Sequence, residues 1–367
     1  MTDLLYIVSR LRPSGPTNQL YYLLKYLDND FNTTVLTLSP EPEDTELPRF
    51  QELDIEYETL GLSRIEGIVY GPTRLRSFVD KLDPDIVHTQ GIRADTLSAL
   101  LLSDYPRVTT IRNYPYDDYP AKFGRFQGNA MAWEHLQVFK RLDHPIACSE
   151  TISKMVEPHG IDATPIQNGV DHYEFTPVSE GEKIELRRDL GLPESDDIIV
   201  SVGSLIPRKD PITIIKGYEQ SDLKDSTLVF LGDGPLLERC EDLSKENESI
   251  HLEGEVDNVV DYLQASDYFV SASRSEGLPN SVMEALSSGL PVCLSDINPH
   301  NEILQYNSEV GIQFDCGSES ELNKALVDLI QEDNVNSDSA RQIAKNNLSA
   351  ERMSDEYQTM YNKIQGA

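Results

Sequence analysis

The stretch that decides the fold is Ser273-Arg-Ser-Glu-Gly-Leu-Pro-Asn-Ser-Val-Met-Glu-Ala-Leu-Ser-Ser-Gly-Leu-Pro-Val292. It follows a short apolar run, Tyr268–Val270, and leads into a second, Pro291–Leu294. The pattern predicts a strand, a loop, a helix at about Ser281–Ser288 and another strand. Short buried strands that alternate with helices are typical of a parallel sheet. The loop should therefore lie at the carboxyl end of its strand, where such sheets bind ligands.

The same alternation extends along the whole chain. Further strands are predicted at Leu4–Val8, Thr34–Leu38, Ile86–His88, Val108–Ile111, Pro145–Ala147, Ile198–Val202, Thr227–Leu231 and Ile250–Leu252. Further helices are predicted at about Thr17–Leu27, Pro72–Leu82, Ala94–Leu102, Phe126–Arg141, Pro211–Gln220, Pro235–Glu246 and Val256–Ala265. Between the two series lies Thr164–Pro177, which contains Asn-Gly and two prolines and is typical of a hinge.

The two series predict an α/β protein with two Rossmann-like parallel-sheet domains that face each other across a cleft. We expect the first domain at residues 1–167 and the second at 168–349, sizes that suit a chain of 367 residues. Apolar and aromatic residues at helical spacing predict a last helix at about 350–364 that packs back on the first domain.

The composition indicates a folded cytoplasmic protein. Hydrophobic residues make up 39% of the chain, but no apolar run approaches the roughly 18 residues of a membrane span. The N-terminus carries an acid where a signal peptide needs bases. The four cysteines lie far apart, without the spacing of a disulfide framework or a zinc site.

The net charge of −32 is unusual, and it makes a nucleic-acid partner improbable because such a field repels polyanions. The 63 acids are spread along the chain and form no tail. One hypothesis is halophilic adaptation, in which salt screens the self-repulsion. The alternative is an ordinary acidic cytosolic protein.

The decisive stretch also carries chemistry. Gly277-Leu278 precede the predicted helix, so their backbone amides are available to anionic or hydroxyl oxygens. Glu276 and Glu284 suit sugar and ribose recognition, since a carboxylate accepts several hydroxyl hydrogen bonds. The structural alternative is that Ser281 and Glu284 form a capping box and that Glu276 is a solvated loop acid.

A second candidate site follows the strand Ile198–Val202. Gly203 would let a ligand approach the backbone, and the adjacent Arg208 and Lys209 could neutralise a diphosphate. The alternative is that both basic side chains simply face solvent.

The stretch Ser273–Val292 resembles the E-x7-E signature of the retaining glycosyltransferases of family 4, which have the GT-B fold. The resemblance implies that Glu276 lies against the donor sugar, that the Gly277 and Leu278 amides hold sugar and phosphate, and that Glu284 binds the ribose. Lys209 matches the family's phosphate-binding lysine. The arginine that often follows the glycine is replaced by Ser204, and Arg208 is expected to take over its charge.

Less specific matches to the family occur in other segments. Glu255-Val256 looks like the loop whose backbone meets the nucleobase, and Gly15 lies in the counterpart of the glycine loop over the donor phosphates. His88 ends a segment similar to the family's D-V-V-H, although a lone histidine at a strand end is more often structural.

Two departures from the family pattern stand in the first domain. Gln90 occupies the place of a second histidine, and Arg112, followed by Asn113, stands where relatives often place a histidine near the sugar. Arg112 cannot act as a base at neutral pH, but it could hold a hydroxyl or an acidic group on the acceptor or sugar side.

The implied function is transfer of a hexose-type sugar from a nucleotide-diphosphate donor to a glycan or lipid-linked acceptor, with retention of configuration. Neither a cofactor nor a metal is expected; Glu276, Lys209, Arg208 and His88 are the catalytic candidates. Membrane contact should be at most peripheral, at the inner face, through a loop predicted at Tyr114–Arg125; the alternative is that this loop packs on the acceptor side. The alternatives are a sugar-nucleotide epimerase of similar fold and a non-catalytic nucleotide-sugar-binding subunit.

Overall fold

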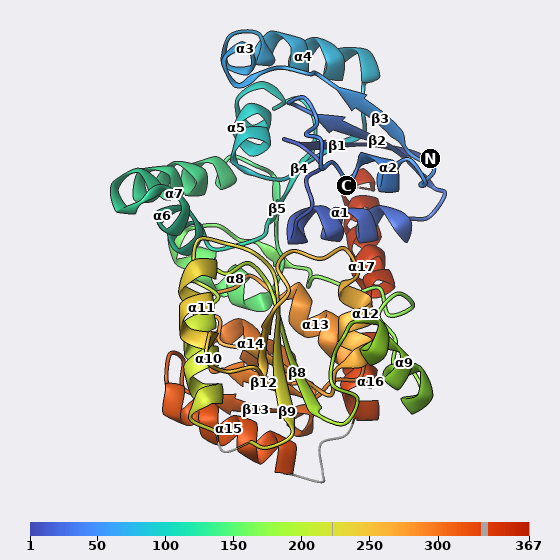
Figure 1. The fold of residues 1–367 in the computed structure, drawn as a ribbon. Helices are drawn as coiled ribbons and strands as arrows, with labels where there is room; N and C mark the ends of the chain where they lie inside the picture. Colours follow the sequence, from blue (N-terminus) through green and yellow to red (C-terminus); the bar gives the residue numbers. More distant parts are fainter. Residues whose placement is uncertain (222, 332–336, 367) are drawn as a thin grey trace. The chain divides into compact units, whose positions relative to one another are not determined.

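A computed structural model describes residues 1–221, 223–331 and 337–366. The chain divides into two compact units (Figure 1). The N-terminal unit contains Met1–Asn168 together with the residues from Ala350 onward, and the C-terminal unit contains Gly169–Ser349.

The N-terminal unit is built on a parallel sheet whose described strands follow the order β3-β2-β1-β4-β5-β6-β7. Strand β1 (Thr2–Val8), which pairs with β2 and β4, alternates between two cores: Leu4, Tyr6 and Val8 face one side, and Leu5 and Ile7 the other. The remaining strands are β2 (Phe31–Thr37), β3 (Glu56–Thr59), β4 (Ile86–Thr89), β5 (Arg107–Ile111), β6 (His144–Ala147) and β7 (Thr164–Pro165).

Helices cover both faces of this sheet. On one face α1 (Gly15–Lys25) packs beside α17 (Ala350–Gln365), which places Tyr357 and Tyr361 in the same core as Tyr6. On the other face lie α4 (Gly71–Leu82) and α5 (Ile92–Leu101). The unit also contains α2 (Leu47–Phe50), α3 (Arg64–Val69), α6 (Pro115–Phe123), α7 (Arg125–Phe139) and α8 (Glu150–Val156).

The prediction of a loop at Tyr114–Arg125 is wrong, because most of this segment forms α6. Pro115 stands at the first helical position, where its missing N–H costs nothing, and Pro120 lies inside the helix. Two prolines within a few residues are more typical of a loop than of a helix, which explains the difference. Gly128 of α7 lies so close to α6 that an added Cβ would overlap the backbone of Pro120. Its missing side chain therefore permits the two helices to meet.

The C-terminal unit has a second parallel sheet, with the described strands in the order β10-β9-β8-β11-β12-β13. The strands are β8 (Asp197–Val202), β9 (Ser226–Leu231), β10 (Ile250–Leu252), β11 (Tyr268–Ser271), β12 (Val292–Ser295) and β13 (Gly311–Phe314). The predicted strands and helices of this unit are present. Helix α12 (Val259–Ala265) nevertheless begins three residues after the predicted start at Val256.

This sheet, too, is covered on both faces. One core includes residues of α12, α13 (Asn280–Ser287) and α16 (Ser337–Asn347), and the other includes residues of α10 (Pro211–Glu219), α11 (Leu237–Ser244) and α15 (Glu319–Gln331). The unit also contains α9 (Glu180–Asp189) and α14 (Asn298–Leu304).

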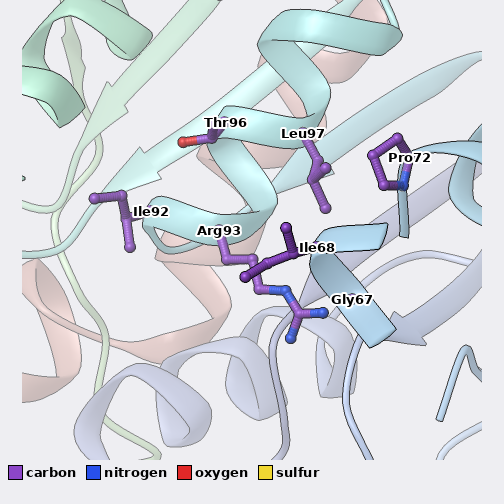
Figure 2. Close-up of a pocket in the computed structure, with 7 residues that line it drawn as sticks. All are labelled: Gly67, Ile68, Pro72, Ile92, Arg93, Thr96 and Leu97. Atoms are coloured by element: carbon purple, nitrogen blue, oxygen red, sulfur yellow. The ribbon is translucent and has the colours of Figure 1, made fainter. Parts of the chain in front are cut away.

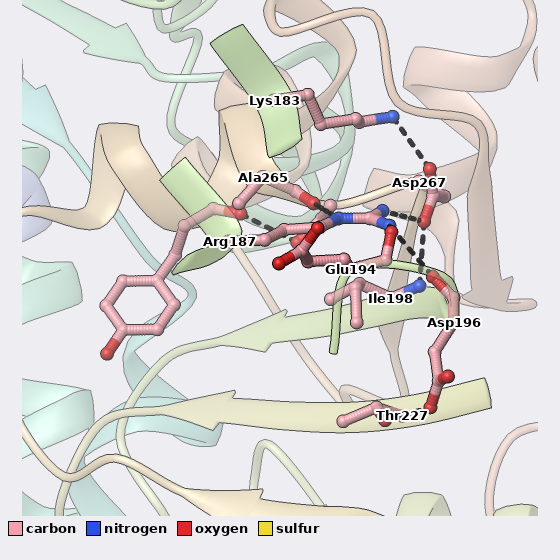
Figure 3. A network of polar contacts seen from close by, with 10 residues as sticks. Lys183, Arg187, Glu194, Asp196, Ile198, Thr227, Ala265 and Asp267 are labelled. Atoms are coloured by element: carbon pink, nitrogen blue, oxygen red, sulfur yellow. Dashed lines mark hydrogen bonds and ion pairs between the residues drawn. The ribbon is translucent and has the colours of Figure 1, made fainter. Parts of the chain in front are cut away.

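A polar network fixes the amino ends of β8 and β11 (Figure 3). Asp267 accepts hydrogen bonds from the Ile198 backbone N–H at 2.7 Å and from Lys183 Nζ at 2.7 Å, and it pairs with Arg187. Arg187 also donates to the Ala265 carbonyl at 2.9 Å. These contacts support the sheet at the amino ends of its strands. The candidate site lies at the opposite, carboxyl ends.

Candidate functional site

The loops after β8 and β11 meet at one buried carboxylate. Glu276 Oε1 lies 2.6 Å from Lys209 Nζ, and Glu276 Oε2 lies 2.7 Å from Arg208 Nη1. Ser273 Oγ donates to Oε1 at 2.8 Å. The Glu276 side chain is only 7% exposed, whereas those of Lys209 and Arg208 are each 21% exposed. The three predicted residues therefore form one cluster, and Glu276 is not a solvated loop acid.

The cluster keeps Glu276 ionised. Burial by itself would raise the pKa of this carboxyl, but Lys209 and Arg208 outweigh it and lower the pKa to about 2. At neutral pH the site thus contains one buried anion and two partly exposed cations.

Local structure explains how the cations are positioned. Gly203 has a φ of +147°, and a Cβ added there would lie 3.3 Å from Lys209 Cε, so the lysine stem lies over the glycine. Asp210, at a φ of +49°, caps α10 and also accepts a hydrogen bond from Arg274 Nη2 at 2.6 Å. Arg274 N donates to the Arg208 carbonyl at 2.8 Å. These contacts tie the loop after β8 to the loop after β11.

Glu284 lies on α13, with its residue 9% exposed. The capping-box alternative is wrong: the residue before the helix is Pro279, which makes no side-chain cap, and Ser281 already lies within the helix. Leu278, just before α13, packs into the core. Glu276 and Glu284 are thus both largely buried; Glu276 lies in the segment that links β11 to α13, and Glu284 lies within α13 itself.

Residues behind Glu276 support it, and no sequence motif assigns them a role. Ser273 Oγ bonds Glu276, while the Ser273 carbonyl accepts from Ser295 Oγ at 2.6 Å. His300 Nδ1 donates to the Ser295 carbonyl at 2.8 Å. Burial lowers the pKa of His300 to about 4, so its ring is neutral at pH 7. Ser273 belongs to the stretch Ser273–Val292, so the sequence pointed to its neighbourhood. His300 follows Pro299 outside any recognisable motif, so its place behind Glu276 could not be predicted.

The loop expected to meet the nucleobase follows β10. Glu255 is exposed, and Val256 packs partly against the core of the C-terminal unit. Gly254 has a φ of +73° and its carbonyl accepts from Gly232 N at 2.6 Å, which links this loop to the glycine turn after β9. This hydrogen bond joins the two loops that follow β9 and β10.

The N-terminal unit has a cavity of about 340 Å³ at the carboxyl ends of β1, β4 and β5, lined in part by Ser14, Pro16, Gln90, Arg112 and Asn113. Gly15 is the first residue of α1, and Ser14 caps that helix by accepting from Thr17 N. We call this cavity the N-terminal pocket.

His88 does not line this pocket. Its ring is completely buried, with Nδ1 2.6 Å from the Tyr361 hydroxyl and Nε2 2.8 Å from Thr110 Oγ1. Burial and nearby Arg112 lower its pKa well below the ordinary value. The placement favours the structural role that the sequence left open for His88 over a catalytic one.

Neither a metal cluster nor a membrane span is found in the described part of the chain. No group of three or more His, Cys, Asp and Glu side chains there could hold a metal ion. Likewise, none of the described helices is long and apolar enough to cross a bilayer.

The chain is similar to known glycosyltransferases. Residues 182–349 match the family described as glycosyl transferases group 1, and residues 13–174 match glycosyltransferase family 4. The chain is 29% identical over 238 residues to an Escherichia coli protein named UDP-Gal:alpha-D-GlcNAc-diphosphoundecaprenol alpha-1,3-galactosyltransferase, covering 59% of each chain. It is 22% identical to the O-antigen biosynthesis glycosyltransferase WclY of Escherichia coli, covering 98% of each.

The fold has close counterparts among solved structures. The crystal structure of HepE from Anabaena in complex with UDP-glucose superposes with a TM-score of 0.84 at 15% identity, covering 99% of this chain and all of that one. The chain spans about three fifths of the length of the galactosyltransferase relative. The two family matches together span most of the sequence, and the predicted fold is confirmed: the chain belongs to the glycosyltransferases of family 4 and has the GT-B fold, with two Rossmann-like domains.

Proposed function

We propose that this protein transfers a sugar from a nucleotide-diphosphate donor to a glycan or lipid-linked acceptor, with the donor on the C-terminal unit. The observation that supports this most is the Glu276, Lys209 and Arg208 cluster at the carboxyl ends of β8 and β11. Family membership supports the same assignment, with Glu284 on the ribose and the amides of Gly277 and Leu278 on sugar and phosphate.

The proposed chemistry is electrostatic. Lys209 and Arg208 stabilise the charge that grows on the departing diphosphate, and because the ion pairs to Glu276 fix them in advance, little reorganisation is needed. Glu276, ionised and nearest the sugar, accepts hydrogen bonds from its hydroxyls. We propose that transfer retains the anomeric configuration, with a leaving phosphate oxygen taking the acceptor proton. No side chain is assigned as a nucleophile.

The donor class is supported by HepE, whose crystal structure contains UDP-glucose. A lipid-linked acceptor is supported by the galactosyltransferase relative, whose name specifies a diphosphoundecaprenol substrate. We also propose a peripheral contact with the membrane through α6 and α7. There Phe126 is 94% and Trp133 61% exposed, beside the basic residues Lys122 and Arg125.

One experiment tests the proposal directly. The purified protein is incubated with a panel of nucleotide sugars, with and without lipid-linked or oligosaccharide acceptors, and free nucleoside diphosphate is measured. A transferase releases diphosphate slowly with water and faster with the correct acceptor. Interconversion of two nucleotide sugars without acceptor would instead indicate an epimerase, and binding without any turnover a non-catalytic subunit.

The same assay tests metal independence. Because two cations already flank the proposed diphosphate position, turnover should survive a chelator. Loss of turnover with chelator and its recovery with magnesium or manganese would contradict the assignment of Lys209 and Arg208.

A further inference from the structure

The two departures from the family pattern meet in the N-terminal pocket. Arg112 Nε donates to Gln90 Oε1 at 2.8 Å, and Arg112 Nη1 donates to Asn168 Oδ1 at 2.7 Å. Gln90 is itself held by the Tyr6 hydroxyl and, through Nε2, by the Pro16 carbonyl, each at 3.4 Å. Both acceptors of Arg112 are neutral amide oxygens. They orient the guanidinium but leave its charge uncancelled.

One donor group of Arg112 remains unused. Nη2 is buried and has no hydrogen-bond partner among the described residues. Burying a charge without a counter-charge is costly, and cations in such positions are ordinarily paired with a carboxylate. The pKa of Arg112 is nevertheless raised: burial opposes the charge, but the neighbouring Tyr357 and Tyr6 hydroxyls outweigh it. The pocket therefore contains a fixed, uncompensated cation.

Two more arginines line the same pocket, Arg10 and Arg93. Burial and repulsion from Arg10 both lower the pKa of Arg93, so the two like charges lie close enough to interact. Lys122, also in the lining, is paired with Asp118 at 2.9 Å. Within residues 1–221, 223–331 and 337–366, none of the three arginines has an ion-pair partner, although the chain has 63 acids and 31 bases.

Arg93 is positioned by a close approach of backbone. Figure 2 draws a second pocket of the same unit, which Arg93 also lines, and there its guanidinium lies beside Gly67 of α3. A Cβ at Gly67 would overlap the guanidinium, with Arg93 Nη2 as the nearest atom. Arg93 Nη1 donates to Ser39 Oγ at 2.6 Å, again a neutral acceptor. The positive character of the pocket is thus built from several elements.

We propose that the N-terminal pocket binds an anionic oxygen group, a carboxylate, sulfate or phosphate, on the sugar that enters it, with Arg112 Nη2 as the principal donor. This inference rests on the proposed function and narrows its substrate class to an acidic or phosphorylated sugar. The group belongs either to the donor sugar or to the acceptor, and binding measurements distinguish these two sources. A guanidinium held by neutral amides is suited to either source, because it presents a planar donor to oxyanions.

Calorimetry at constant ionic strength tests the proposal with methyl glucuronide and the neutral methyl glucoside. The wild-type protein should bind the glucuronide at least about tenfold more tightly, the lower end of the effect of a charge-assisted hydrogen bond. Arg112→Gln should abolish that preference. Gln90→Glu should also abolish the preference, because a carboxylate beside the guanidinium cancels the charge of Arg112. The thermal midpoint of this variant should be no lower than that of the wild type.

The Gln90→Glu variant separates ligand binding from a purely structural role of Arg112, since it keeps the arginine in place. The matched control is Arg188→Gln, which breaks an exposed ion pair with Glu194 in the C-terminal unit and should keep the preference. Equal binding of the two glycosides to the wild type, or an undiminished preference in Gln90→Glu, would overturn the proposal.

Two further titrations identify the source of the anion. A preference for UDP-glucuronate over UDP-glucose that disappears in Gln90→Glu assigns the group to the donor sugar. Equal binding of these two nucleotides, with a preference for methyl glucuronide in saturating UDP, assigns it to the acceptor. Because every readout is binding, a protein that binds the anion but transfers no sugar would refute the proposed function and leave this inference standing.

Discussion

At the scale of single residues, replacements of Glu276, Glu284 and Lys209 should change the kinetic constants in different ways. A charge-assisted hydrogen bond contributes about 1.5–3 kcal/mol, which corresponds to roughly 10- to 150-fold. Glu284, if it binds the ribose, makes the same contacts before and during transfer. Glu284→Gln should therefore raise the KM for the donor by about that factor and change kcat less.

Lys209 and Glu276 should affect the rate itself. In the proposed reaction Lys209 meets charge that grows on the leaving group, so Lys209→Ala should lower kcat as well as kcat/KM. Glu276→Gln should lower kcat most, because the proposed reaction places Glu276 nearest the reacting sugar and because its carboxylate pairs with both cations. Steady-state kinetics of the three variants measures this order. Near-normal donor affinity in Glu284→Gln together with unimpaired turnover in Glu276→Gln would contradict the proposed site.

The ionisation of Glu276 should also make stability depend on pH. Its folded pKa of about 2 lies below the ordinary glutamate value, so it contributes stability that is complete above about pH 5 and is lost as the pH falls toward 2. Glu276→Gln lacks this contribution. The difference in free energy of unfolding between wild type and variant should shrink over that window, from ~3 kcal/mol or less. A difference that stays constant from pH 7 to pH 3 would contradict the ion-paired assignment.

At the scale of secondary structure, the packing of α6 on α7 depends on Gly128. An added methyl group would meet the backbone of Pro120, which cannot move as a flexible side chain could. Gly128→Ala should cost about 1–3 kcal/mol, the usual range for overpacking. Gly181→Ala is the matched control: it also lies in a helix, but a Cβ there meets nothing within 4 Å. Equal thermal midpoints of these two variants would contradict the close packing.

The same helices present the proposed membrane contact. Replacing Phe126 and Trp133 together by serine should reduce binding to liposomes that contain anionic lipid, because both rings are exposed and contribute little to the core. Co-sedimentation measures the change, and the exposed Tyr173 of the C-terminal unit, replaced by serine, serves as the control. If the wild type stays in the supernatant with and without liposomes, the membrane proposal fails.

The sequence predicted those elements whose pattern is strong. Buried strands such as Ile198–Val202 and the E-x7-E segment carry local signals, and the structure confirms the elements there. The segment Tyr114–Arg125 was misread because proline and tyrosine suggested a loop, while packing of α6 against Gly128 stabilises a helix. The pairing of Gln90 with Arg112 could not be predicted, because 22 residues separate them and only the adjacent strands β4 and β5 bring them together.

At the scale of the whole molecule, the net charge of −32 should make stability depend strongly on salt. Repulsion among carboxylates acts over about 10 Å at 0.1 M salt and over about 3 Å at 1 M. Since the folded chain concentrates these charges more than the unfolded chain, added salt should stabilise the fold, as the halophilic hypothesis requires.

Chemical unfolding in urea, followed from 0.1 to 2 M potassium chloride, measures the effect. The free energy of unfolding should rise steeply below 1 M and then level off, because screening saturates once the Debye length is shorter than the spacing of the charges. Sucrose is the control, since it stabilises by exclusion from the surface without screening charge. A rise that continues linearly beyond 1 M and is matched by sucrose would indicate exclusion alone. Indifference to potassium chloride would refute the halophilic hypothesis and leave the ordinary acidic protein as the explanation of the composition.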